Sequence, residues 1–290
     1  MRQRILSAFI FLFTAGAAAA ESYTDAGGRY TAGPDGYAGM SAFAEWGDDS
    51  YYLRPALNTY KSDLSDRKSI YSFGAGLERE RWSAGAELSL TPETAGYKNT
   101  GLYGDFTYRL LGEPADDAAL EDLALGVFCG LTAHEDAYAT STTTVYSGRR
   151  GGSSSALTDA FKLNQTDYGV SASLKAFGLR ASGRFTKTAY DKDVTEEARQ
   201  LPIEIGGVGA SGFPDTAVSV RLRVPGLPLS PEAGYAKTTY LLDQPSSEAL
   251  NFGVSVRAGR AELSAGWENF NPGGGAGRSD YYSLGLTFSF

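Results

Sequence analysis

The feature that most constrains this chain is a succession of segments in which apolar and polar residues alternate with a period of two. In the clearest segment, residues 82–90, the apolar positions are Trp82, Ala84, Ala86, Leu88 and Leu90. The same alternation recurs at residues 102–110, 167–175, 179–186, 218–224, 250–257 and 262–268. Because successive side chains of a strand point to opposite faces, this pattern predicts β-strands with one apolar face.

The predicted strands are long, at about nine to twelve residues each. A typical strand has about 5–6 residues, whereas a tilted strand needs about 9–11 residues to cross a bilayer. Nothing after residue 20 approaches the roughly 18 uninterrupted apolar residues that indicate a membrane-spanning helix. The sequence therefore predicts an all-β protein, a transmembrane antiparallel β-barrel.

The connections between these segments alternate between short and long. Short turns are predicted at residues 78–81, 177–178, 224–227 and 258–259, and longer polar links at residues 91–100, 133–166, 191–215, 241–248 and 271–280. Short turns on one rim and long loops on the other are typical of transmembrane barrels, with the short side periplasmic. The link at residues 112–119 is longer than its rim predicts.

The number of strands follows from parity. Counting back from Phe290 gives thirteen candidate segments, whereas single-chain bacterial barrels have even strand numbers. A weak strand at residues 22–31, followed by a turn at residues 32–36, raises the prediction to about fourteen. Twelve is the alternative if this N-terminal segment is a plug or lies outside the wall.

The N-terminal residues predict export. Arg2 and Arg4 precede an apolar stretch from Ile5 to Phe13, and Ala18 to Ala20 form a small-residue cleavage site. This order is typical of a secretory signal, so we expect residues 1–20 to be a signal peptide and residues 21–290 a single barrel domain. Without Arg2 and Arg4 the formal net charge changes from −8 to −10, which argues against binding nucleic acid.

The last segment carries the most specific pattern. Its apolar positions are Tyr282, Leu284, Leu286, Phe288 and Phe290. Here the sequence resembles bacterial outer-membrane β-barrel proteins of the porin-like kind, whose final strand ends in an aromatic residue read by the barrel-assembly machinery. The resemblance implies machine-assisted insertion into the bacterial outer membrane, in contact with its lipid and lipopolysaccharide, and it identifies no narrower subfamily.

The polar positions of the strands are expected to face the lumen. They combine glycine and serine with charged residues, which suits a polar interior. The candidate lumen-facing charges are Lys175, Arg180, Arg184, Arg221, Arg223, Arg257, Glu87, Asp105, Glu232, Glu262 and Glu268. From the turns on either side we expect Arg180 to lie near Arg223 and Arg184 near Arg221, about 5 Å apart between adjacent strands.

Signals for catalysis, cofactors and metals are weak. His134 is the only histidine and is followed by Glu135 and Asp136. Barrel phospholipases resemble each other in a His-x-Ser pair, and Asp136 occupies the third position here. With no further ligand cluster, we expect a solvated loop tip rather than a metal site. The glycine pattern at residues 207–212 has no following helix and therefore predicts no dinucleotide site.

These observations favour a passive porin-like channel for small polar or ionic solutes, without enzymatic activity. The row of charges would then create a local potential that attracts ions. A structural or surface barrel with a filled lumen is the main alternative, since small barrels fill their interiors. A transporter of hydrophobic compounds is a third hypothesis, based on the apolar link from Leu201 to Phe213. In the link at residues 133–166, Arg149 and Arg150 could bind lipopolysaccharide phosphates or form part of a constriction.

Overall fold

The computed structural model describes residues 22–63, 65–94, 96–111, 120–136, 140–143, 155–158, 161–194, 202–205, 208–225 and 228–290. The predicted signal peptide, the link at residues 112–119 and the Arg149–Arg150 pair lie outside the described residues. In the described part of the chain, no helix is long and apolar enough to cross a membrane.

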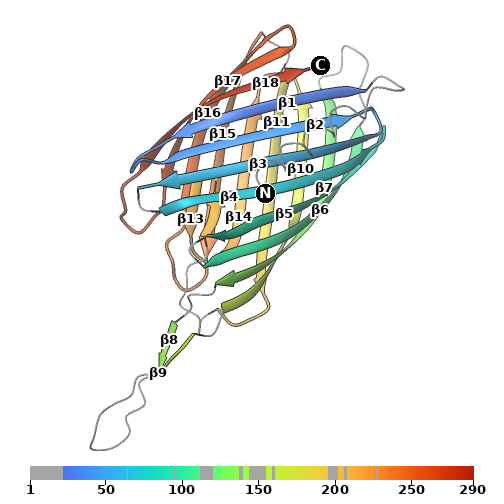
Figure 1. The fold of residues 1–290 in the computed structure, drawn as a ribbon. Coiled ribbons are helices and arrows are strands. Elements are labelled where there is room, and N and C mark those ends of the chain that lie inside the picture. The colour runs from blue at the N-terminus through green and yellow to red at the C-terminus, as the bar shows by residue number, and fades with distance from the viewer. Residues whose placement is uncertain are drawn as a thin grey trace, which may run out of the picture.

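Fourteen antiparallel strands close into one barrel (Figure 1), which confirms the predicted fold class. The wall strands are β1 (Tyr23–Ala32), β2 (Ala38–Gly47), β3 (Tyr51–Ser62), β4 (Ser65–Glu78), β5 (Trp82–Thr94), β6 (Tyr97–Leu111), β7 (Leu120–Asp136), β10 (Phe161–Ala176), β11 (Leu179–Tyr190), β14 (Pro214–Arg223), β15 (Leu229–Tyr240), β16 (Ser247–Ala258), β17 (Ala261–Asn271) and β18 (Ser279–Ser289). Each strand pairs with the preceding and following wall strand, and β1 pairs with β18.

The pairing of β1 with β18 closes the wall. The register runs from Asp25 opposite Ser289 to Ala32 opposite Tyr282, and the backbone N–H of Phe290 donates to the carbonyl of Thr24 at 2.8 Å. Strand β1 coincides with the weak strand predicted at residues 22–31. The fourteen-strand prediction is therefore confirmed, and the twelve-strand alternative is wrong.

The two ends of the barrel differ. At the terminal end, where β1 begins and β18 ends, most links are short, as at Phe177–Gly178 between β10 and β11, whereas the link between β6 and β7 spans residues 112–119. At the loop end, two small antiparallel sheets lie within the links: β8 (Thr140–Thr143) with β9 (Ser155–Thr158), and β12 (Pro202–Ile205) with β13 (Val208–Ser211). Strands β8 and β9 project from the barrel on the side away from the C-terminus (Figure 1).

Several strands are longer than predicted. Strand β7 has 17 residues, and β5 and β6 remain paired as far as Thr94 opposite Tyr97. The predicted long link at residues 91–100 is therefore wrong, since only residues 95–96 separate these strands. Near the loop end both faces of the strands carry polar residues, and the apolar–polar alternation is lost. The backbone pairing nevertheless continues there.

The outer face of the barrel is an apolar surface built from alternate residues of the wall strands. Leu284 is 67 % exposed, and Leu88, Val127, Val170 and Phe252 are about half exposed. Exposure of so many large apolar side chains indicates a surface that faces lipid rather than water.

Among the described residues, seven of the nine buried apolar residues gather in two clusters at the loop end. One contains Tyr97, Leu163, Val194 and Phe213, and the other contains Ala249, Phe270 and Tyr281. Phe213 is fully buried, and its ring makes an edge contact with Tyr190 at 5.7 Å between centroids. This end of the predicted apolar link packs against the rim and does not form an exposed mouth for apolar solutes.

Candidate functional site in the barrel lumen

On one side of the lumen, large side chains from β6, β7 and β11 stack on one another. The Arg184 guanidinium carbon lies 3.5 Å from the ring centroid of Phe128 and 5.5 Å from that of Tyr103. The two rings are 6.0 Å apart. A guanidinium over an aromatic face is attracted by the ring quadrupole, so the rings hold Arg184 against the β6–β11 side of the wall.

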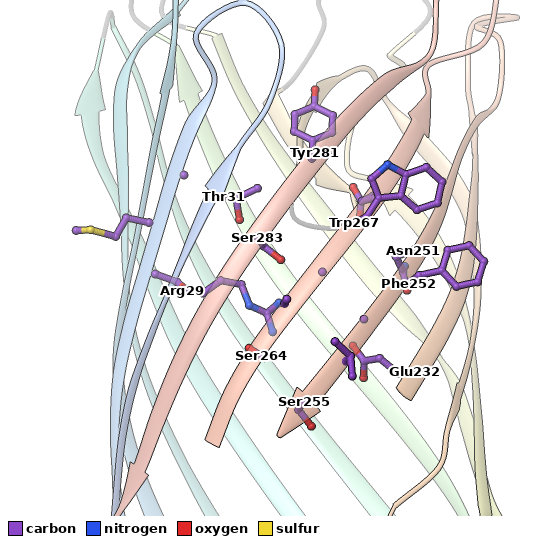
Figure 2. Close-up of a pocket in the computed structure, with 18 of the residues that line it drawn as sticks. Arg29, Thr31, Glu232, Asn251, Phe252, Ser255, Ser264, Trp267, Tyr281 and Ser283 are labelled. Carbon is purple, nitrogen blue, oxygen red and sulfur yellow. The ribbon is translucent and has the colours of Figure 1, made fainter. Parts of the chain in front are cut away.

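The opposite side of the lumen contains a cavity of about 560 Å³, bounded by β1–β3 and β14–β18. Its wall includes small residues at adjacent positions, with Gly253 opposite Gly266 and Gly266 opposite Ser283. The Glu232 side chain lies over Gly253, and the Ser283 hydroxyl lies over Gly266. Figure 2 shows Arg29, Ser264, Ser283 and Glu232 around this cavity.

The cavity wall carries charges of both signs. The basic residues are Arg29, Arg221 and Arg223, and the acidic residues are Glu232, Glu262 and Glu268. Arg223 lies opposite Glu232 in the β14–β15 register, and its Nη2 donates to Ser255 Oγ at 3.2 Å. The cavity is therefore polar and nearly balanced in charge.

A second cavity, of about 310 Å³, lies at the terminal end of the lumen and is lined by Asp25, Arg257, Gly259, Arg260, Ala261, Glu262, Thr287 and Ser289. Glu262 and Thr287 line both cavities. At this junction Glu262 Oε1 is 3.6 Å from Arg223 Nη2, and Glu262 Oε2 is 3.2 Å from Arg257 Nη2. One carboxylate thus joins a basic residue of the main cavity to a basic residue of the terminal cavity.

The structure brings only part of the predicted charge set together. Arg221, Arg223, Glu232, Glu262 and Glu268 line the main cavity, and Arg257 lines the terminal one. Lys175 and Arg180 lie opposite each other on β10 and β11. Glu87 and Asp105 lie on β5 and β6, outside both cavities.

The predicted basic row is correct at one end and wrong at the other. Arg180 lies opposite Arg223, as predicted, but Arg184 lies opposite Ser219 and Arg221 lies opposite Ser182. Because β11 and β14 are antiparallel, the residue four positions after Arg180 pairs with the residue four positions before Arg223. Arg184 therefore pairs with Ser219, not with Arg221. Arg184 contacts Phe128 instead of joining a row of arginines.

His134 is not at a solvated loop tip. It lies within β7, is 4 % exposed and belongs to a hydrogen-bonded chain. Tyr97 Oη is 2.7 Å from His134 Nδ1, and His134 Nε2 is 3.2 Å from Gln165 Oε1. The Gln165 amide donates in turn to Asp167 Oδ2 at 2.8 Å. Among the described residues, no group of three or more His, Cys, Asp or Glu side chains is arranged to hold a metal ion.

Sequence reasoning missed several cavity residues. Arg29 lies on β1, where the alternation is weakest, and Asn251 lies on β16 beside the predicted charges. Tyr281, from the last strand, forms part of the buried cluster at the loop end of the cavity. Their position in the alternation of each strand could have identified them, because all three belong to the polar set of their strands.

The predicted assembly residues lie on the outer face of β18. Tyr282, Leu284 and Phe290 are each at least 60 % exposed, and Leu286 and Phe288 are partly exposed. Their recognition by assembly machinery stays a prediction.

No protein-family model matches the chain, and no curated protein matches its sequence. Solved structures resemble its fold. CdiB from Acinetobacter baumannii has a TM-score of 0.52 at 8 % identity, with 94 % of this chain and 61 % of that chain covered. This chain therefore spans less than two thirds of CdiB.

Two further structures cover the same barrel at lower similarity. The CymD monoaromatic hydrocarbon channel has a TM-score of 0.48 at 10 % identity, with 93 % of this chain and 88 % of that chain covered. A loop-deletion mutant of OmpT, an outer membrane protein of Vibrio cholerae, has a TM-score of 0.45 at 11 % identity, covering 93 % and 98 %.

The fold is that of bacterial outer-membrane β-barrel proteins, a class that includes porins and channels. The closed wall and its apolar outer face are those of a β-barrel that spans a membrane.

Proposed function

We propose that this protein is a passive channel for small polar or ionic solutes. The observation that supports the proposal is the pair of polar cavities that share Glu262 and Thr287 and extend through one side of the lumen to its terminal end. A polar, hydrated interior is the property that distinguishes a conducting barrel from a filled one. We propose no catalytic activity.

Glu262 is the proposed selectivity residue. Its carboxylate lies between Arg223 and Arg257, so it neutralises part of the positive charge where the two cavities meet. Charged side chains that line a narrow passage set the local potential for permeating ions. Removal of this carboxylate should leave two basic residues at the junction and favour anions.

The test is the reversal potential of single channels in planar bilayers under a salt gradient. Glu262→Gln should raise the anion-to-cation permeability ratio by roughly threefold near 0.1 M salt and far less near 1 M, since the Debye length falls from about 10 Å to about 3 Å. Glu248→Gln is the matched control. Glu248 pairs with Lys237 at 3.3 Å on the outer face of β16, so selectivity should not change.

A structural barrel with a filled lumen is the second candidate, and the stack of Arg184 on Phe128 supports it. Purified, folded protein that never conducts would favour this candidate and contradict the channel. Transport of hydrophobic compounds has less support, because the main cavity is lined largely by charged and hydroxyl side chains and Phe213 is buried.

We also propose contacts with outer-membrane lipid and lipopolysaccharide. Lys98 and Lys162 lie on the outer face near the loop end, 2.7 Å and 3.1 Å from the carboxylate oxygens of Glu135. Paired lysines of this kind are suited to phosphate groups at a membrane surface. Assembly by the barrel-assembly machinery, with Phe290 as its signal, belongs to the same proposal.

A further inference from the structure

The main cavity contains charged groups that the ion pairs at Glu262 do not use. In the described part of the chain, the guanidinium groups of Arg29 and Arg221 have no hydrogen bond or ion pair. On the acidic side, Glu268 Oε1 is buried without a hydrogen-bond partner among the described residues. Two guanidinium groups without a partner, and a glutamate with one buried, unsatisfied oxygen, therefore belong to the wall of one cavity.

These groups come from different parts of the wall. Arg29 lies on β1, Arg221 on β14 and Glu268 on β17. In the strand register Arg221 is opposite Gly234, Gly234 is opposite Asn251 and Asn251 is opposite Glu268. Arg221 and Glu268 thus lie on one row across the wall, separated by Gly234 and by Asn251, whose side chain lies over Gly234.

The chemistry of these groups specifies a ligand with two charges. A guanidinium presents a fork of N–H donors that matches a carboxylate, and a buried carboxylate oxygen requires a donor such as an ammonium group. A simple anion would be repelled by the Glu268 carboxylate and would leave Glu268 Oε1 without a hydrogen-bond donor. A simple cation would be repelled by the two arginines. A small zwitterion satisfies both signs at once.

We propose that this cavity is a binding site for small zwitterionic solutes of the amino-acid class, with the solute carboxylate toward Arg29 and Arg221 and its ammonium toward Glu268. This proposal names a class of solute for the proposed channel. Transport of the solute rests on the proposed channel function, whereas binding of the solute does not. The cavity volume of about 560 Å³ lies within the roughly 300–1,000 Å³ that is usual for small-molecule pockets.

The direct test is isothermal titration calorimetry of the folded, detergent-solubilised protein with L-glutamine as the probe. Saturable binding is expected at low salt, with weaker binding of the dianion succinate, the dication putrescine and the neutral sugar glucose. Glu268→Gln and Arg221→Gln should each weaken glutamine binding about tenfold. Glu87→Gln is the matched control, because Glu87 lies on β5 outside both cavities and should leave the affinity unchanged.

Three results would overturn the proposal: no saturable heat with L-glutamine, glucose binding as tightly as L-glutamine, or full affinity in Glu268→Gln. Failure of the channel is distinguishable from these results. If the protein binds L-glutamine but never conducts in a bilayer, the channel proposal is wrong and the binding-site proposal stands. If it conducts but does not bind L-glutamine, the binding-site proposal is wrong and the channel proposal stands.

Discussion

At the scale of single residues, a stack of a cation on aromatic rings shapes one side of the lumen wall. Arg184, Phe128 and Tyr103 stack inside β6, β7 and β11. The stack needs room on β10, where Gly169 lies opposite Phe128 in the strand register. A cation over an aromatic ring contributes about 0.5–2 kcal/mol, so this contact stabilises the position of Arg184.

Gly169→Ala should therefore destabilise the barrel. A Cβ atom at this position would clash with the carbonyl oxygen of Phe185 and lie 2.6 Å from Phe128 Cζ. We expect a loss of about 1–3 kcal/mol, as for other overpacked interiors, measured by urea unfolding in lipid vesicles. Gly130→Ala on β7 is the control, since its nearest heavy atom would be Tyr103 Cδ2 at 3.5 Å. Equal stability of the two variants would show that both the Phe185 backbone and the Phe128 ring move to accommodate the added Cβ atom.

At the scale of the element, each wall strand separates a lipid face from a lumen face. On β4, Phe73 is 49 % exposed on the outer face. The adjacent Ser72 belongs to the inner face, opposite Ala56 on β3 and Ser89 on β5. Both residues lie near the middle of the strand, so they differ mainly in the surroundings of the side chain.

Phe73→Arg should destabilise the folded barrel by about 2–4 kcal/mol, because a charge near the bilayer midplane is costly on the lipid face. Ser72→Arg, with small neighbours and a polar lumen, should cost much less. The free energy of unfolding in vesicles measures both variants. A Ser72→Arg barrel as unstable as Phe73→Arg would mean that the two faces are assigned the wrong way round.

At the scale of the whole molecule, closure through β1 and β18 removes every free strand edge from the wall. Thr31 and Ser283 are direct partners across this seam. Directly opposed residues of antiparallel strands have Cα atoms about 4.5–5.5 Å apart, within the range of a disulfide.

In a Cys129→Ser background, Thr31→Cys with Ser283→Cys should form a disulfide on mild oxidation, detected by electrophoretic mobility with and without reductant. The control pair, Thr31→Cys with Gly285→Cys, is displaced by two residues in the register and should cross-link far less. Equal cross-linking of both pairs, or of neither, would contradict the closed register of fourteen strands.

The fold was largely predictable from the sequence because its main signal is local. Alternation with period two requires only that successive side chains point to opposite faces, so Leu88 and Leu102 could be assigned to the apolar face without their neighbours. The weak strand β1 was predicted because thirteen candidate strands were found and a single-chain barrel needs an even number. The extensions of β5, β6 and β7 were missed because pairing with a neighbouring strand, rather than alternation, maintains them at the loop end.

The candidate site was only partly predictable. The sequence by itself determined which charged residues belong to the polar set of the strands, including Arg221, Glu262 and Glu268. Only the tertiary structure decided which of them meet, because the distance between side chains in a barrel depends on register and closure, which relate residues far apart in the chain. That is why Arg29 on the first strand shares a cavity with Arg221 and Glu268, while Arg184 contacts Phe128 and takes no part in it.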